Sequence, residues 1–360
     1  MTSLFQDNKS KFLMLLSGCF LVVLLLGGCE TINYYSQGIQ GHFHLVSQVK
    51  PIDEVIDHKD TPADTRKLLK HAKLARAFAI EHLKLPDNQS YLGYADLKRK
   101  QVTWTIVATK PLSMEPYQSC FPITGCLSYR GYFREVAAQQ FAEHLREEGY
   151  ETFVGGSTAY STLGWFKDPI VSPMLRFGEI RLIETLFHEL AHQELYIKDD
   201  SDFNEAFATT VGQNGAREWL RETDPEALSR YNEYLIRYKR FLNLLGRTSK
   251  QLKALYLTES TDEHKVNKKQ DIFNKLRQDY QQFKDHNDGY SGFDKWFEKP
   301  INNPRLTLVT VYHELVPDFE RWLKACNNHY PHFYKTVERI ANLPKEQRIE
   351  TLKQPATCTK

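Results

Sequence analysis

A His-Glu-Leu-Ala-His run at residues 188–192 is the feature that most limits how this chain can fold. It lies within residues 177–196, where apolar residues recur at helical spacing, so we predict a helix there. Residues four apart share one face of a helix, and His188 and His192 can therefore reach one metal ion. Glu189 then points into the same site, where it can act as a general base toward water. The pattern is typical of zinc-dependent hydrolases, and of peptidases above all.

Glu205 can supply a third ligand from a second predicted helix, residues 203–221, which follows a short turn. A set of two histidines and one glutamate leaves a fourth position open and suits zinc, so we expect one Zn²⁺ per chain. Cobalt, manganese and nickel fit the same ligands. The apolar neighbours of the run support a metal, because such polar groups are costly to bury without a cation. The aspartates within residues 199–202 are assigned to capping and solvent contacts.

The N-terminus has the pattern of a lipoprotein signal. Two lysines precede an apolar stretch, residues 12–26, which is short for a membrane span and leads to Gly-Gly-Cys29. We predict that residues 1–28 are a signal peptide and that Cys29 is lipidated and anchors the chain to a membrane. An uncleaved anchor with an incidental cysteine is the alternative. Glu30, where an Asp would favour the inner membrane, favours the periplasmic face of the outer membrane in a bacterial cell envelope.

Four of the six cysteines remain after the signal segment and Cys29: Cys120, Cys126, Cys326 and Cys358. In an oxidising compartment these can form two disulfides in three possible connectivities. Closeness in sequence favours Cys120 with Cys126 and Cys326 with Cys358. A second metal site at Cys120 and Cys126 is the competing interpretation.

The mature chain is long enough for one large domain or two small ones. A formal net charge of +2 and the lack of a basic patch interleaved with aromatics argue against nucleic acid as a partner. We divide the chain into a lipidated tether (29–60), a metallopeptidase core with the zinc site (61–224), a helical hairpin insertion (225–285) and a helical C-terminal part that completes the core (286–360). The hairpin is expected to break near Gly246 and again within residues 258–262.

The expected fold class is α+β and predominantly α-helical. A small β-sheet from residues 100–160 would lie beside the metal-helix pair, in a gluzincin-like arrangement. The predicted strands are residues 102–109 and 152–160, and the further predicted helices are 65–83, 135–148, 306–326 and 330–340.

Hydrolysis of an amide also needs a group that stabilises negative charge on the carbonyl oxygen. Tyrosine and histidine commonly serve this purpose. Tyr160, in a glycine-flanked predicted strand, and Tyr312 or His313, in a late predicted helix, are the candidates. An aminopeptidase would also need an acidic group for the substrate's ammonium, for which Glu179, Glu184 and Asp168 are possible.

Several long blocks of the chain resemble the putative aminopeptidases of Gram-negative bacteria, a family of predicted zinc metallopeptidases that are often lipoproteins. The blocks are residues 85–88 (LPDN), 91–97 (YLGYADL), 120–133 (CFPITGCLSYRGYF), 159–169 (AYSTLGWFKDP), 186–193 (LFHELAHQ), 203–208 (FNEAFA) and parts of 302–317. The resemblance implies that His188, His192 and Glu205 are metal ligands and that Glu189 is the base. It also implies that Tyr160 and its strand border the cleft that binds a peptide substrate.

Two departures limit what better-known relatives imply. Twelve residues separate His192 from Glu205, fewer than in thermolysin or the large aminopeptidases, and the Gly-Met-Glu-Asn type motif that holds a substrate's amine is absent. We therefore expect a membrane-tethered zinc metallopeptidase, with aminopeptidase activity as the more specific expectation. A non-catalytic, zinc-stabilised envelope protein that presents the hairpin to a partner, or a zinc amidase that acts on cell-wall peptides, is the alternative.

Overall fold

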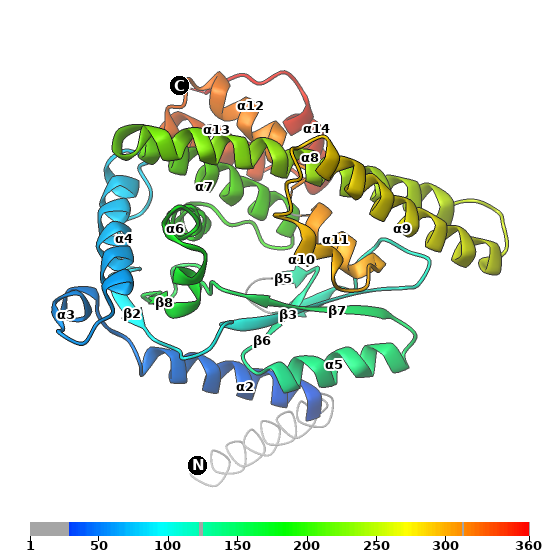
Figure 1. Cartoon of the computed structure of the whole chain (residues 1–360), viewed down its shortest axis with the longest axis horizontal. Helices are drawn as coiled ribbons and strands as arrows, with labels where there is room; N and C mark the ends of the chain where they lie inside the picture. The colour runs from blue at the N-terminus through cyan, green and yellow to red at the C-terminus, as the bar shows by residue number, and fades with distance from the viewer. Residues whose placement is uncertain (1–28, 122–124, 312, 360) are drawn as a thin grey trace, which may run out of the picture.

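A computed structural model describes residues 29–121, 125–311 and 313–359. Helices supply most of this part of the chain (Figure 1). They are α2 (Cys29–Val46), α3 (Ile52–Asp57), α4 (Ala63–Glu81), α5 (Glu135–Glu147), α6 (Glu179–Glu194), α7 (Ser201–Thr223), α8 (Pro225–Tyr256), α9 (Asp262–Asp285), α10 (Asp294–Phe297), α11 (Asn303–Val311), α12 (Val316–Ala325), α13 (Tyr330–Ala341) and α14 (Lys345–Lys353), with a 3₁₀ segment, η1 (Ser172–Phe177). Among the described residues, none of these helices combines the length and apolar character needed to cross a bilayer.

The strands are short and form three small sheets. They are β1 (Lys50–Pro51), β2 (Gly93–Ala95), β3 (Thr103–Thr109), β4 (Ser119–Phe121), β5 (Gly125–Leu127), β6 (Arg130–Tyr132), β7 (Glu151–Ser157) and β8 (Ile170–Val171). The largest sheet has the order β6-β3-β7, and β3 pairs antiparallel with β7 from Thr103 opposite Ser157 to Thr109 opposite Glu151. The fold is therefore α+β and predominantly helical, as expected from the sequence.

The centre of the main core is the pair of helices α6 and α7, which pack on each other, with α4 packed against α6. Apolar residues of α6 recur at helical spacing and are fully buried, among them Leu182, Leu186 and Leu190. The two helices approach closely at Gly212 of α7, where a Cβ would lie 2.9 Å from the carbonyl oxygen of Glu184 and 3.2 Å from the Cβ of His188. A glycine is thus required where α7 passes the first histidine of the metal run.

The helices α8 and α9 form a long hairpin that packs on α7 and α11. The expected break near Gly246 is wrong, because α8 continues through this residue. One glycine costs a helix interior only about 1 kcal/mol, which the burial of Phe241, Leu245 and Leu252 along the same helix offsets. The turn between the two helices occupies residues 257–261, within one residue of the other expected break.

The segment assigned from the sequence to a lipidated tether, residues 29–60, contains two helices, α2 and α3. Residues 29–46 form α2, whose inner face is fastened to the body of the protein: Leu45 is 1% exposed, and the Oε1 atom of Gln37 accepts a hydrogen bond from the backbone N–H of Phe133. Gly41 allows the ring of Phe133 to approach, because a Cβ at that position would lie 2.1 Å from the ring. The sequence pattern was ambiguous because, among the described side chains of α2, only Gln37 and Leu45 are buried.

The predicted single helix at 306–326 is two helices, α11 and α12, with a turn at residues 313–315. Pro317 is in the first turn of α12. A proline disfavours helical backbone in the residue before it and cannot donate the hydrogen bond of a helix interior, so it begins a new helix. This break places His313 in a turn.

Two disulfides are present in the pairing that sequence proximity favoured, Cys120 with Cys126 and Cys326 with Cys358. The first joins β4 to β5 across a directly paired position of their antiparallel hairpin. The second links the residue after α12 to the C-terminal segment. Cys120 and Cys126 are therefore not available as ligands of a second metal site.

We expect Gly212→Ala to lower the free energy of unfolding by about 1–3 kcal/mol, because the added methyl group must displace the backbone of α6. Gly246→Ala is the matched control: no atom lies within 4 Å of its added Cβ, so this change should stabilise the protein by about 0.5–1 kcal/mol. Urea unfolding followed by circular dichroism measures both. Equal effects of the two substitutions would contradict the importance of the contact.

Candidate metal centre

Three side chains converge from the two central helices. His188 and His192 come from α6, four residues apart, and Glu205 comes from the second turn of α7. The Nε2 atoms of the two histidines are 3.1 Å apart, and a carboxylate oxygen of Glu205 lies 3.3 Å from Nε2 of His188 and 3.6 Å from Nε2 of His192. In the part of the chain that the structure describes, this is the one group of three or more such side chains that could hold a metal ion.

These separations fit a tetrahedral zinc site. Ligand atoms about 2.0–2.1 Å from zinc are about 3.3 Å from one another in a tetrahedron, close to all three observed separations. Two nitrogens and one oxygen form the mixed set that zinc accepts, and His188 and Glu205 remain 21% and 15% exposed, so a fourth position can be reached from solvent. The residues present therefore fit the metal that the sequence pattern indicates.

The electrostatics of the three side chains also favour a cation. Burial opposes ionisation of Glu205, but the charge of His192 and hydrogen bonds from both histidines outweigh burial and lower its pKa. Burial likewise opposes protonation of His188, and its hydrogen bond with Glu205 and the negative charge of that residue outweigh burial and raise its pKa. The cluster thus stabilises positive charge among its ligand atoms, and a metal ion supplies such charge without protons.

Glu189 follows the first ligand and is half-buried. Burial raises the pKa of its carboxyl group, the histidines oppose this increase, and the negative charges of Glu205 and Asp168 add to it. A carboxylate with a raised pKa accepts a proton more readily at neutral pH. The position and the pKa of Glu189 both suit a general base.

A polar stripe extends along α6 on the N-terminal side of the cluster. Arg181 and Glu184 form an ion pair at 2.7 Å, and Arg181 is exposed. Tyr231, Tyr234 and Tyr238 of α8 recur at helical spacing opposite this pair. Burial is the main cause of the raised pKa of all three tyrosines, and the negative charge of Glu184 adds to the increase. Helix α8 therefore lies beside the polar stripe of α6.

His313 lies near the cluster and accepts or donates a hydrogen bond at 3.0 Å between its Nε2 atom and the hydroxyl of Tyr238. Burial lowers the pKa of His313 to about 4, with a smaller contribution from His188, while the charge of Glu205 opposes the shift. His313 is consequently neutral at pH 7. Tyr312, the neighbouring candidate, lies outside the described residues.

Tyr160 is in the loop after β7, three residues beyond the strand that was expected to contain it. Its hydroxyl is 3.3 Å from Nδ1 of His42 on α2, and its ring packs edge-to-face on Phe133. Burial, and then the charge of Asp168, raises its pKa, so the hydroxyl keeps its proton. The structure thus pairs Tyr160 with α2.

Asp168 connects this loop to α6. Its carboxylate accepts hydrogen bonds from the backbone and hydroxyl of Thr162, from the hydroxyl of Ser161 and from the side-chain amide of Gln193, next to His192. Burial raises the pKa of Asp168. Glu184 has a cationic partner in Arg181, and Glu179 lies 2.5 Å from His71, whereas Asp168 is held by these neutral donors.

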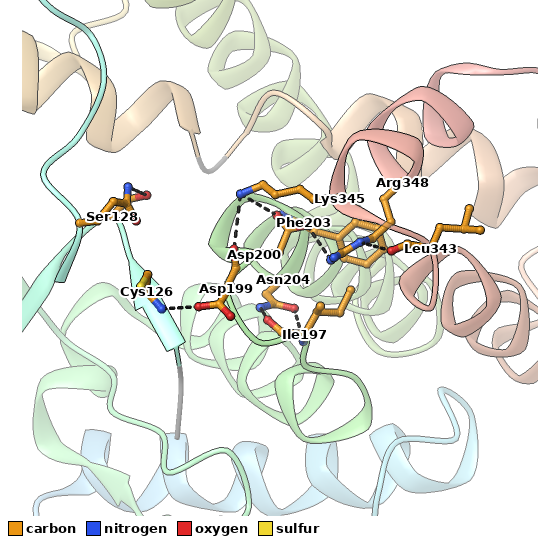
Figure 2. Close-up of polar contacts among 11 residues, drawn as sticks. Cys126, Ser128, Ile197, Asp199, Asp200, Phe203, Asn204, Leu343, Lys345 and Arg348 are labelled. Carbon is orange, nitrogen blue, oxygen red and sulfur yellow. Dashed lines mark hydrogen bonds and ion pairs between the residues drawn. The ribbon is translucent and has the colours of Figure 1, made fainter. Parts of the chain in front are cut away.

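The turn between the two central helices is fastened on both sides (Figure 2). Asp199, with a positive φ of 66°, points toward the disulfide hairpin, where its carboxylate accepts a hydrogen bond of 2.6 Å from the N–H of Cys126. Gly125 makes this contact possible, because a Cβ there would lie 2.2 Å from the Asp199 carboxylate. Within the turn, the side chain of Asn204 bonds both the N–H and the C=O of Ile197.

Asp200 fastens the other side of the turn to α14. It is 1% exposed, lies 2.7 Å from the guanidinium of Arg348, and accepts a hydrogen bond from the N–H of Phe203 as the N-cap of α7. Lys345 adds a longer ion pair of 3.8 Å. The aspartates were expected to cap and to face solvent; Asp200 does cap, but it is buried by an ion pair that the sequence did not reveal.

Sequence reasoning missed Tyr238 and Arg348. Tyr238 belongs to a run of tyrosines on α8 that resembles an ordinary packed face, and its only distinguishing feature is a partner 75 residues away. Arg348 is one of several charged residues on a short, polar helix. Neither carries a local signal, because both act through contacts between distant parts of the chain.

Arg348→Met should lower the free energy of unfolding by about 3–5 kcal/mol, since it leaves Asp200 charged and buried. It should also weaken zinc binding, because Asp200 caps the helix that carries Glu205. Lys345→Met is the control: this lysine is 48% exposed, so the expected loss is about 1 kcal/mol or less. Urea unfolding and competition with a zinc-sensitive dye measure the two effects. Equal losses from both substitutions would exclude this role for Arg348.

Comparison with known proteins supports a family assignment. No curated protein and no solved structure matches the chain. A family model described as "Putative aminopeptidase" matches residues 33–352, from the second turn of α2 to the last turn of α14, and includes all the residues of the metal cluster. Because the model covers nearly the whole chain, this protein belongs to the putative aminopeptidase family.

Proposed function

We propose that this protein is a gluzincin-like zinc metallopeptidase that hydrolyses peptides from the amino end, as a lipoprotein on the periplasmic face of the bacterial outer membrane. The family supports peptidase activity and a peptide substrate. The convergence of three ligand atoms at separations that match a tetrahedral zinc site, with Glu189 next to the first ligand, is the observation that carries the proposal.

The chemistry divides between the metal and this chain's side chains. A bound zinc ion supplies Lewis-acid activation of water and of the scissile carbonyl. Glu189 accepts the proton of the attacking water and delivers it to the leaving amine, as its raised pKa favours. His188, His192 and Glu205 would hold the ion.

His313 is the group we assign to the developing negative charge on the carbonyl oxygen. The raised pKa of Tyr238 keeps its hydroxyl protonated, so the hydroxyl can donate to Nε2 of His313. In a neutral imidazole that accepts at Nε2, the proton lies on Nδ1, which can then donate to substrate. Tyr238 thus orients His313 and selects its tautomer.

The substrate's ammonium group needs an acidic partner, for which we assign Asp168. Its charge influences Glu189, so it lies near the reacting centre, and its hydrogen-bond donors are neutral. Glu184 and Glu179 each face a basic side chain instead.

Glu189→Gln should keep zinc and lower kcat for an aminoacyl reporter by about 100- to 10,000-fold, because the amide cannot accept the proton. Glu205→Gln is the contrasting variant and should lose zinc affinity. Metal content by mass spectrometry and initial rates distinguish the two. A reporter with an acetylated N-terminus should be cleaved far more slowly by the natural protein; equal rates would mean an endopeptidase. Retained activity in Glu189→Gln would exclude the mechanism.

His313→Ala should lower kcat by about 100- to 1,000-fold with little change in KM, as expected for a group that acts in the transition state. Tyr238→Phe should lower kcat less, because His313 remains but loses its orienting partner. Tyr234→Phe is the matched control: its ring stacks on Tyr238 at 5.7 Å and the phenylalanine keeps that contact. Equal kcat values for the two tyrosine variants would argue against the assigned role of Tyr238.

A further inference from the structure

The outward face of α2 is an apolar stripe. Five of its residues are large, apolar and exposed: Ile32 (49%), Tyr35 (41%), Ile39 (57%), Phe43 (67%) and Val46 (42%). Their spacing of three, four, four and three residues places them within an arc of about 80° on a helix of 3.6 residues per turn. The helix contains no lysine, arginine or aspartate. Such a continuous exposed apolar face marks a contact surface.

The opposite face of α2 fixes this stripe in its outward orientation. Tyr34 stacks on Phe121 with ring centroids 5.4 Å apart, and Gln37, Gly41 and Leu45 make the contacts with the body of the protein described above. These four residues lie about half a turn from the stripe. The helix cannot roll to bury Ile39 or Phe43 without breaking them.

The apolar surface continues beyond α2 onto the loop that contains Asp168. Trp165 is 69% exposed and Phe166 is 59% exposed, and the ring of Phe166 lies 4.8 Å from that of His42 on α2. Lys167 follows and is exposed. Exposed Trp and Phe with an adjacent cation are suited to the boundary between lipid headgroups and acyl chains.

The chain that precedes α2 identifies what covers this face. Two residues separate an apolar segment, residues 12–26, from α2, which begins at Cys29. Whether a lipid at Cys29 or the apolar segment itself enters the bilayer, the first turn of α2 starts at the membrane surface. We propose that α2 lies flat in the membrane interface, with its apolar stripe, Trp165 and Phe166 in contact with lipid.

This geometry goes beyond anchoring, because it fixes the orientation of the protein. A flexible tether would let the body rotate freely, whereas a helix fastened to the body on one face and to lipid on the other holds it in one pose. In Figure 1, α2 and α5 lie along one side of the molecule, and α12 and α13 lie along the opposite side. The proposal concerns docking, and it does not depend on hydrolysis.

Nitroxide labels test this docking in the full chain. The labels are introduced through Ile39→Cys and Phe43→Cys, with Leu257→Cys, 87% exposed at the turn between α8 and α9, as the control. The protein is reconstituted in vesicles of phosphatidylethanolamine and phosphatidylglycerol. We expect labels 39 and 43 to lose collisions with a water-soluble nickel complex and to keep collisions with oxygen, which concentrates in lipid. Label 257 should keep both.

Three outcomes are distinguishable. Nickel accessibility at 39 and 43 equal to that at 257 would overturn the proposal. Protection from both nickel and oxygen, with dipolar coupling between labels on two molecules, would overturn it in favour of a dimer of this chain. The expected pattern supports it, provided that zinc content and the thermal midpoint match those of the unlabelled protein. Mass spectrometry of the N-terminal residue shows separately whether Cys29 is lipidated. A lack of lipidation can therefore be distinguished from a lack of docking by α2.

Discussion

The close approach of α6 and α7 is the constraint on which the candidate site depends. Two histidines on one helix supply only two ligands of a metal site. The third ligand must come from a neighbouring helix that is close enough for a glutamate side chain to reach the two histidines. Gly212 removes the side chain that would separate the helices beside His188. The surrounding core of leucine and phenylalanine then holds this distance, because densely packed interiors do not deform continuously.

Three peripheral parts of the fold support this pair. The disulfide hairpin β4–β5 and the helix α14 hold the connecting turn from opposite sides, through Asp199 and Asp200. The hairpin α8–α9 closes a third side and brings Tyr238 to His313. Each of these three supports makes a polar contact between residues that are far apart in the sequence.

The parts of the structure that sequence predicted are those governed by local pattern. Apolar periodicity located α4, α5, α6 and α7 to within a few residues, and spacing identified His188, His192 and Glu205 as neighbours. Prediction failed where distant contacts decide the outcome. Helix α2 has few apolar residues on its inward face, and it packs on Phe133, which is far away in the sequence. The break after α11 occurs in a strongly apolar run, before Pro317 in the first turn of α12. The ion pair of Arg348 joins residues 148 positions apart.

The ion pair between Asp200 and Arg348 also has a consequence for the order in which the centre is assembled. The two residues are 148 positions apart, and Arg348 follows all three residues of the metal cluster in the sequence. The pair can form only after α14 has been synthesised and has packed against the turn between α6 and α7. In a chain made from its N-terminus, His188, His192 and Glu205 are therefore present well before the contact that stabilises the first turn of the helix bearing Glu205.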